Sequence, residues 1–513
     1  MPAIRNLTRC RLSLVLLSWV VVGSSLAQGR KDGLEDAWGP RYQAHSQSGA
    51  SALQPRRSSG NSPMSWLRHW NEMAIDASGL DHTPLAPGEQ RTFGEQFGPT
   101  RSSRAMAIVH IAIFDAVNAI VGGYQSYTGR ARVHGEASLR AAIAQAAHDT
   151  LCALYPSQCA SFAAELRADL SRIPNSKARA NGIDLGRRAA IAILDMRAND
   201  GSNHAEPRVG IKFITSNKPG KWRQDPISQI PLALGAYWGG VRPFVLQSGD
   251  QFRAPAPPAL TSAQYGLAYN EVQRLGGDGV TTPTVRSSEQ TEIGIFWAYD
   301  GTPSLCAPPR LYNQITVQIA EQMGSNFVEL ARLLALVNVA MADAGIAVWE
   351  AKYFYQYWRP VTGIRESDPG SGPTGFGDGN LVTIGDVNFS PLGAPASNLA
   401  GPNFTPPFPA YPSGHAGFGG ALFQMLRRFY GTDKIPFTFV SDEFNGITRD
   451  ISGAVRPLVP RNFANLSEAE EENGQSRIYL GIHWSFDKTE GIAQGRRVAD
   501  YVMKHVFAPV DRR

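Results

Sequence analysis

Apolar residues recur every three to four positions over most of the chain beyond residue 64. This period places them on one face of a helix, whereas no run of alternating apolar and polar residues indicates a set of strands. The pattern therefore predicts a mainly α protein, in which Pro360 ends the longest helix. The predicted helices cover residues 104–120, 139–154, 160–170, 178–198, 262–275, 287–299, 309–323, 326–358, 413–430, 474–482 and 486–506.

Two long segments lack this period. Residues 201–260 are rich in glycine, proline and aromatic residues, and residues 368–410 are rich in glycine and proline. Both are typical of irregular connections. For a chain of 513 residues of which 43% are hydrophobic, this organisation predicts two helical bundles with long irregular connecting loops. We place the N-terminal bundle at residues 65–275 and the C-terminal bundle at residues 276–513.

The first 27 residues resemble a secretory signal peptide. Three arginines precede an apolar run from Leu12 to Val22, and Ala27 ends a short cleavage-like sequence. The alternative is an uncleaved anchor, although the run is short for a membrane span. Residues 28–64 are polar and predict a flexible lead-in. We therefore expect a secreted or periplasmic protein with no membrane span in the mature chain.

Charge and cysteine content narrow the possible partners. The net charge of +5 falls to about +2 without the three arginines of residues 1–27, and no basic stripe with interleaved aromatic residues indicates nucleic-acid binding. Cys152 and Cys159 lie close together, which leaves a local disulfide and two buried thiols both open. Cys306 has no obvious partner. The sequence does not indicate an oligomeric state.

The first of three notable segments contains Lys352 and Arg359. They are seven residues apart, and on a helix this spacing returns to nearly the same face, so both charges would aim at one point. Cationic side chains of this kind usually project into water. The neighbours here are aromatic, however, and a charge in such surroundings needs a counter-ion.

The second segment reads Pro412-Ser413-Gly414-His415 and lies where a loop meets a predicted helix. Ser413 suits the N-cap, and a helix N-terminus binds anions through its free N–H groups and its dipole. Gly414 allows the backbone to approach an anion closely. His415 lies in the first turn, where it can exchange protons with a bound species. The alternative is a plain capped helix start.

The third segment carries Arg477, His483 and Asp487. Arginine offers a planar, permanently charged fork for oxyanions. His483 can act as a nucleophile or a metal ligand, and Asp487, one helical turn later, can fix its tautomer. Arg477 and His483 would not share a face of an unbroken helix, so Gly481 is predicted to mark a break. A structural role for an isolated histidine is the alternative.

Together the three segments offer three positive charges, a hydroxyl, a glycine amide and two imidazoles, a set that suits a multiply charged tetrahedral oxyanion. Other chemistries have little support. The chain contains no His-Glu-x-x-His zinc motif and no paired cysteine motif, and Ser413 does not lie in a Gly-x-Ser-x-Gly elbow. Residues 370–379 lack the ending of a phosphate loop, and residues 417–420 lie inside a predicted helix.

At these residues the chain resembles the superfamily that joins vanadium-dependent haloperoxidases with type 2 phosphatidic acid phosphatases and bacterial class A acid phosphatases. All three motifs are complete. The likeness is greater to the fungal chloroperoxidase branch over about residues 290–430 and again over 476–490. There it includes the stretches around Trp297–Gly301, residues 334–360, and Pro406–Tyr411.

This resemblance implies vanadate as cofactor and assigns roles to the site residues. Lys352, Arg359 and Arg477 would neutralise the vanadate oxygens, while Ser413 and the Gly414 amide would hydrogen-bond them. His483 would bind vanadium, and His415 would be the acid–base group. The resemblance also implies that Asp300 holds Arg477 and that Trp349 and Phe408 line the halide pocket.

Two enzymatic hypotheses follow. The first is a haloperoxidase that oxidises chloride or bromide with hydrogen peroxide to hypohalous acid, which then reacts with small organic acceptors. The second is a secreted acid phosphatase in which His483 forms a phosphohistidine. Phosphate and vanadate share one shape, so the neighbourhoods of Asp300, Trp349 and Phe408 favour the first. A third hypothesis, a helical scaffold that binds an anion structurally, does not explain the second imidazole.

Overall fold

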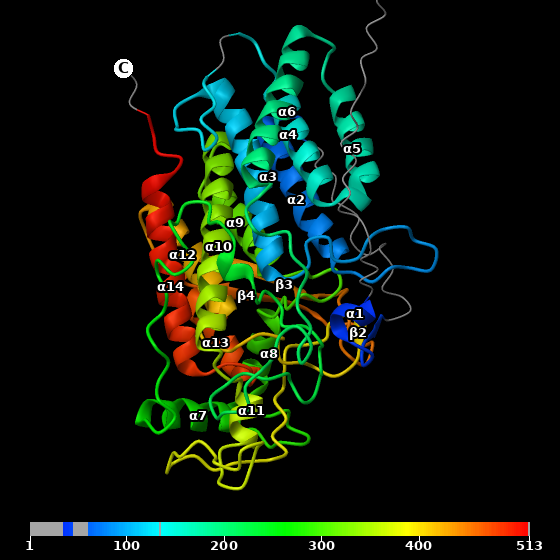
Figure 1. The fold of residues 1–513 in the computed structure, drawn as a ribbon. Coiled ribbons are helices and arrows are strands. Elements are labelled where there is room, and N and C mark those ends of the chain that lie inside the picture. Colours follow the sequence, from blue (N-terminus) through cyan, green and yellow to red (C-terminus); the bar gives the residue numbers. More distant parts are fainter. Residues whose placement is uncertain (1–33, 45–59, 133–134, 511–513) are drawn as a thin grey trace, which may run out of the picture. The chain divides into compact units, whose positions relative to one another are not determined.

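A computed structural model describes residues 34–44, 60–132 and 135–510. Helices dominate it (Figure 1), as the sequence predicted, and two small two-stranded sheets accompany them. The helices are α1 (Leu34–Trp38), α2 (Pro63–Asp81), α3 (Pro99–Val121), α4 (Leu139–Leu154), α5 (Cys159–Ser171), α6 (Lys177–Arg197), α7 (Ala263–Leu275), α8 (Ser288–Phe296), α9 (Pro308–Gln322), α10 (Phe327–Tyr355), α11 (Pro360–Arg365), α12 (Gly414–Tyr430), α13 (Leu466–Tyr479) and α14 (Ser485–His505), with short 3-10 helices η2 (Pro156–Gln158) and η3 (Trp238–Gly240).

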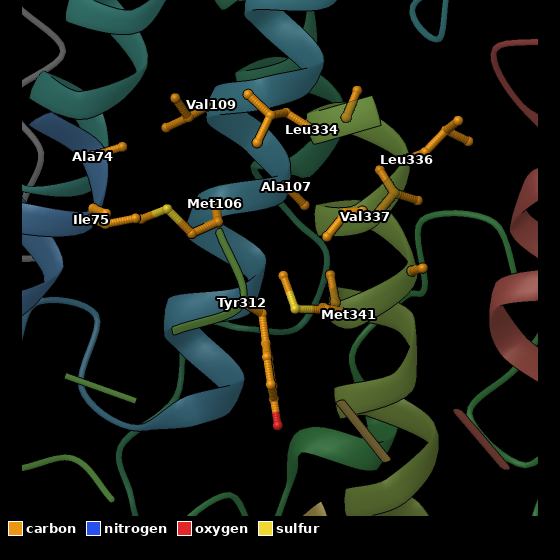
Figure 2. Packing of buried hydrophobic residues seen from close by; sticks show 14 of the residues in the cluster. Ala74, Ile75, Met106, Ala107, Val109, Tyr312, Leu334, Leu336, Val337 and Met341 are labelled. Atoms are coloured by element: carbon orange, nitrogen blue, oxygen red, sulfur yellow. The ribbon is translucent and has the colours of Figure 1, made fainter. Parts of the chain in front are cut away.

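The main hydrophobic core lies around α3 and α10, which run side by side. Figure 2 shows Ala107 of α3 pointing toward Val337 of α10, and Met106 of α3 reaching toward Ile75 of α2. These side chains are buried because both long helices are apolar on nearly all sides. The same core continues into the C-terminal helices, across the boundary placed at residue 275. The division into two bundles stays a prediction.

Helix α10 carries the first cationic side chain of the site. It begins at a capping box, in which Asn326 accepts from backbone N–H groups and Glu329 returns a bond to the cap. It ends at Tyr355, where Gln356 adopts a left-handed conformation with φ 50°. The prediction that Pro360 ends this helix is wrong. Pro360 instead begins α11, because a proline fits the first helical position without losing a hydrogen bond.

Helices α12 and α14 pack against each other closely enough to require glycine. A Cβ atom placed on Gly495 would lie 2.1 Å from the carbonyl oxygen of Gly417, and one on Gly491 would lie 2.7 Å from that of Ser413. Gly420 similarly faces the Ile492 backbone. Neighbouring glycines on both helices therefore bring the start of α12 against the first half of α14. His483, one of the two site histidines, lies just before α14.

The helix is interrupted between α13 and α14, at the glycine where the sequence predicted a break. Gly481 has φ 72°, a left-handed conformation that glycine adopts without strain. A Cβ there would also lie 2.4 Å from the carbonyl oxygen of Gly276. This turn separates Arg477 on α13 from His483, which immediately precedes α14.

The strands were not anticipated from the sequence. β3 (Phe437–Asn445) and β4 (Leu458–Phe463) form an antiparallel pair. Gln43–Ala44, which is β1, pairs antiparallel with Leu399–Ala400, which is β2. With α1 before it, β1 shows that part of the predicted flexible lead-in, residues 34–44, has regular structure. Trp38 explains this ordering, since it is buried edge-on against Phe404 with ring centroids 4.7 Å apart.

Three further expectations concern the cysteines, membrane spans and the signal peptide. Cys152 and Cys159 form a disulfide, which resolves the alternative left open by the sequence, and Cys306 is a buried thiol. By length and composition alone, helices α3 and α10 are long and apolar enough to cross a membrane, and the expected absence of a membrane span stays a prediction. Their most apolar windows are 83% and 100% buried within the protein, as in core helices. The predicted signal peptide, residues 1–27, lies outside the described residues.

Candidate active site

One cavity is lined by residues of the second and third sequence motifs. Its wall includes Gly414 and His415 from α12, Arg477 from α13 and His483 from the turn before α14. The residues singled out by the resemblance and found on this wall are Asp300, Trp349, Phe408, Gly414, His415, Arg477 and His483. Lys352, Arg359, Ser413 and Asp487 are buried directly behind or beside them, as their contacts show.

Lys352 is fully buried in the last turn of α10. Its ammonium group donates to the carbonyl oxygens of Pro409 and Ala410, both at 2.8 Å, and lies 5.2 Å from the ring centre of Phe408. These partners are neutral. Burial, and next the charge of Arg359, hold the pKa of Lys352 well below its usual value. The positive charge is therefore energetically costly in the absence of a bound anion.

Arg359 reaches the site by a route that the sequence did not indicate. It is the N-cap of α11 and does not lie on the helix of Lys352, so the same-face argument fails. Its guanidinium donates to the carbonyl oxygens of Phe408 at 2.9 Å and Ile482 at 2.8 Å. Burial lowers the pKa of Arg359 to about 9, which leaves it charged at neutral pH. Two consecutive helices, α10 and α11, thus deliver one cation each to one place.

His483 has its two ring nitrogens assigned by their partners. Nδ1 lies 2.8 Å from a carboxylate oxygen of Asp487, and Nε2 lies 2.9 Å from Nη1 of Arg359. A carboxylate accepts and a guanidinium donates, so Nδ1 carries the proton and Nε2 presents its lone pair. Burial, followed by the charge of Arg359, lowers the pKa of His483 and keeps the ring neutral. A neutral imidazole oriented by a carboxylate is the form that binds metals.

Arg477 is held from one side only. Its Nη2 donates to both carboxylate oxygens of Asp300, at 2.8 and 2.7 Å, which is the pairing that the resemblance implied. Nε and Nη1 of Arg477 are buried and have no hydrogen-bond partner within residues 34–44, 60–132 and 135–510. Burial raises the pKa of Asp300 despite this ion pair. The unpaired edge of a buried guanidinium indicates a missing acceptor.

His415 also has a defined tautomer. Its Nε2 lies within hydrogen-bond distance of the carbonyl oxygen of Ala298, which can only accept, so Nε2 carries the proton. Nδ1 therefore presents a lone pair, with Asp300 Oδ1 3.8 Å away. Burial and the charge of Arg477 hold the pKa of His415 well below its ordinary value. The backbone of His415 is fixed by Tyr312 and Asn473, which both donate to its carbonyl oxygen at 3.1 Å.

Ser413 and Gly414 form the helix end that faces the cations. Ser413 is the N-cap of α12, as predicted, and accepts from the Ala416 amide at 3.4 Å. The first N–H groups of the helix have no acceptor within it. A Cβ on Gly414 would lie 3.0 Å from the Trp349 ring, a tight contact that favours glycine here. The helix start thus offers free donors at the wall of the cavity.

Trp349 and Phe408 form an aromatic wall beside these donors. Their ring centroids are 4.9 Å apart at an angle of 58°. The Trp349 indole donates to the carbonyl oxygen of Leu234 at 3.1 Å, which fixes its ring. The guanidinium of Arg359 lies 5.1 Å from the Phe408 ring centre. An aromatic surface among fixed cations suits a weakly hydrated anion.

Sequence reasoning missed several contributors. The backbone carbonyl groups of residues 408–410 position Lys352 and Arg359. Every residue type has such a carbonyl group, so the sequence does not reveal this role. Tyr312 and Asn473 orient His415 from α9 and α13 with no local motif. Trp38 lines the cavity from the segment that was predicted to be flexible. Its bulky aromatic character among polar neighbours was the only signal available.

The site fits a tetrahedral oxyanion. It brings together three buried cations, a helix N-terminus and a guanidinium edge that has no acceptor among the described residues, against the two carboxylates of Asp300 and Asp487. Burying unpaired positive charge is unfavourable, and a multiply charged anion relieves it through charge-assisted hydrogen bonds. The lone pair of His483 Nε2 adds a ligand for the central atom. Phosphate and vanadate both satisfy these groups.

Comparisons with known proteins identify the family. The model for the VCPO second helical-bundle domain matches residues 332–512. The vanadium chloroperoxidase of Curvularia inaequalis is 30% identical over 499 residues, which cover 82% of this chain and 79% of the relative.

Solved structures agree in fold. A bacterial vanadium-dependent iodoperoxidase is similar with a TM-score of 0.66 and 23% identity, covering 86% of this chain and 98% of its own. A holo-type bacterial vanadium-dependent chloroperoxidase has a TM-score of 0.56 and 17% identity, covering 82% of this chain and 94% of its own. At these identities the structures support the fold alone, and the sequence relative establishes the family. The chain belongs to the vanadium-dependent haloperoxidases.

Proposed function

We propose that this protein oxidises halide, chloride or bromide, with hydrogen peroxide to hypohalous acid and uses vanadate as its cofactor. The observation that carries the proposal is the pairing of an anion site with two neutral, buried imidazoles of opposite tautomer. His483 presents its Nε2 lone pair among the cations, and His415 presents its Nδ1 lone pair on the cavity wall. Anion binding alone requires neither.

Vanadate would be held by Lys352, Arg359 and Arg477 through charge, by Ser413 and the Gly414 amide through hydrogen bonds, and by His483 through Nε2. When bound, vanadium(V) supplies a Lewis acid that activates peroxide without a change of oxidation state. Asp487 keeps the proton of His483 on Nδ1, so Nε2 is unprotonated and accepts from Arg359 in this structure. Asp300 holds the Arg477 fork in position. Each of these roles is part of the proposal.

His415 would take and return the proton that peroxide must lose. Its Nε2 donates to Ala298, so only Nδ1 can accept a proton. The nearby carboxylate of Asp300 stabilises the imidazolium that forms. Lys352 supplies a further positive charge, which favours negative charge developing on oxygen. Trp349 and Phe408 would border the halide and exclude water from it.

The phosphatase alternative would use His483 as the nucleophile. We do not adopt it, because the sequence relative is named as a chloroperoxidase. We propose further that the protein is exported and that small organic molecules accept the oxidised halogen. The basic and apolar start of the chain supports export, and so does the disulfide between Cys152 and Cys159, since such bonds persist in oxidising compartments.

The test is an assay of the purified protein after incubation with orthovanadate. Peroxide-dependent oxidation of iodide, bromide and chloride is followed as triiodide formation or as halogenation of a dimedone dye. Vanadate-free protein is the matched control and should be inactive. Hydrolysis of a phosphate ester without halide oxidation under any condition would overturn the proposal and restore the phosphatase alternative.

A further inference from the structure

A second group of potential metal ligands lies outside the anion site and joins helices α2 and α5. His69 belongs to α2, while Glu165 and Asp169 are four residues apart on α5, so both carboxylates lie on one face of that helix. The candidate ligand atoms of the three residues all lie within 4.8 Å of one another. None of the three lines the cavity of the anion site. We call these three residues the His69 cluster.

The imidazole of His69 is buried and lacks a hydrogen bond. Its side chain is 7% exposed, and neither ring nitrogen has a hydrogen-bond partner among the residues that the structure describes. Nε2 nevertheless lies 3.2 Å from Oε1 of Glu165. Since a pair at this distance fails as a hydrogen bond only through its angle, the oxygen lies away from the N–H direction. Neighbouring ligands of a tetrahedral zinc ion are also about 3.3 Å apart, because zinc bonds to nitrogen and oxygen are about 2.0–2.1 Å long.

The carboxylates of the His69 cluster are only partly neutralised. Trp70 Nε1 donates to Oδ2 of Asp169 at 3.0 Å, and Arg172, which is 39% exposed, reaches Oδ1 at 3.5 Å. Among the described residues, no lysine or arginine forms an ion pair with Glu165. Burial is the main cause that raises the pKa of Asp169, and the charge of Glu165 raises it further.

A protonated His69 is the simplest alternative source of positive charge in the cluster. Both nitrogens of an imidazolium are donors, and an imidazolium beside two carboxylates would direct an N–H group at one of them. Neither nitrogen of His69 makes such a hydrogen bond. A divalent cation bound between the three side chains instead satisfies the imidazole lone pair and neutralises both carboxylates, which relieves the cost of burying them.

We propose that His69, Glu165 and Asp169 bind one zinc ion, which joins α2 to α5, and that water completes its coordination. One imidazole with two carboxylates suits zinc, whereas calcium and magnesium prefer oxygen ligands alone. The ion lies outside the cavity of the anion site, so its role is to hold two helices together, and it takes no part in halide oxidation. Because the unfolded chain does not bring the three ligands together, zinc binding stabilises the folded protein.

His148 on α4 supplies a matched control. It lies beside Cys152 and Cys159, but their sulfur atoms form the disulfide and are not thiolate ligands. Nδ1 of His148 lies 2.7 Å from Oδ1 of Asp149. His148 and Asp149 therefore form a histidine–carboxylate pair that lacks the second carboxylate of the His69 cluster.

The first test measures zinc binding by titration calorimetry. The protein is dialysed against a chelator, incubated with orthovanadate so that the anion site is filled, freed of excess vanadate and titrated with zinc sulfate. We expect one zinc ion per chain, with an affinity that falls at least about tenfold in Glu165→Gln and in His69→Gln. His148→Gln should bind zinc as the unaltered protein does. Absence of saturable binding, or equal affinity in Glu165→Gln and the unaltered protein, would overturn the inference.

The second test measures thermal unfolding with and without zinc. Zinc should raise the melting temperature of the unaltered protein and of His148→Gln, and it should leave that of Glu165→Gln nearly unchanged. Glu165 is 20% exposed at its side chain, so its replacement by the isosteric amide keeps the test valid even if His69→Gln does not fold. An equal rise in Glu165→Gln and in the unaltered protein would show that zinc binds elsewhere, which contradicts the inference.

Discussion

The contact between α12 and α14 makes a strong prediction for Gly495→Ala. The added Cβ would lie 2.1 Å from the carbonyl oxygen of Gly417, and both groups are parts of rigid helices. Relief requires the helices to separate by about 1 Å, since close-packed interiors do not absorb such overlap. Alanine gains about 1 kcal/mol over glycine in a helix, while overpacking costs about 1–3 kcal/mol, so the clash outweighs the propensity.

The separation should act on chemistry more than on stability. One turn before Gly495, Gly491 lies against the Ser413 carbonyl, so the shift changes how the start of α12 faces Asp487 and His483. A misplacement of about 1 Å in a catalytic arrangement costs about 100-fold in rate. We expect a loss of this order in triiodide formation and a weaker affinity for vanadate, measured by titration calorimetry, with a melting temperature equal to or below that of the unaltered protein.

Gly240→Ala is the matched control, because a Cβ at Gly240 meets no atom within 4 Å. It should retain full activity and vanadate affinity. If Gly495→Ala melted at a higher temperature and oxidised halide at the unaltered rate, the reasoning about helix contact would be refuted.

Four further results are expected. His483→Ala should weaken vanadate retention at least about 100-fold, whereas His415→Ala should retain vanadate and lose halide oxidation by about 10²–10⁴-fold; dialysis and activity together check both, and the reverse pattern would show that the roles are exchanged. Vanadate at 100 times its dissociation constant should stabilise the fold by about 2.7 kcal/mol, seen as a higher melting temperature. Replacing Cys152 and Cys159 together by serine should destabilise the fold by about 2–3 kcal/mol for so short a loop, measured by thermal melting with reduced protein for comparison. Burial raises the pKa of Asp343 from 3.8 to about 6. The folded protein therefore binds this proton more tightly than the unfolded chain, and the free energy of unfolding should fall by about 3 kcal/mol as the pH rises from below 4 through 6. Denaturation across this range should show a smaller fall in Asp343→Asn, and an equal fall would contradict the assignment.

Much of the helical framework was predictable, because the apolar spacing and the capping residues of a helix are visible in its own sequence. Ser413 at the start of α12 and Gly481 between α13 and α14 carry local signals that survive in the fold. The motifs also predicted three cations that the structure brings together, but the spacing did not give the reason for their convergence. Arg359 reaches the site from a second helix, since Gln356 ends α10 before the expected residue.

Contacts between segments far apart in the sequence could not be predicted from local sequence patterns. Trp38 meets Phe404 across more than 300 residues, and neither position reveals the other. The glycines of α12 and α14 left a weak trace, since Gly491 and Gly495 lie four residues apart on one helical face. This spacing indicates a close helix contact only once the partner helix is known. Strand β3 alternates buried and exposed residues at its start, but nothing in that pattern indicates that β4 is its partner.

The sulfur atoms in the core have a consequence for an enzyme that releases an oxidant. Hypohalous acid attacks thioethers and thiols, which turns an apolar methionine into a polar sulfoxide that disrupts packing. Met106 and Met341 in Figure 2 are 1% and 0% exposed, and the Cys306 thiol is equally enclosed. Met196 and Met323 are 43% and 40% exposed. Self-inflicted damage would thus begin at the periphery, where oxidised methionine is tolerated, and spare the interior that supports the site.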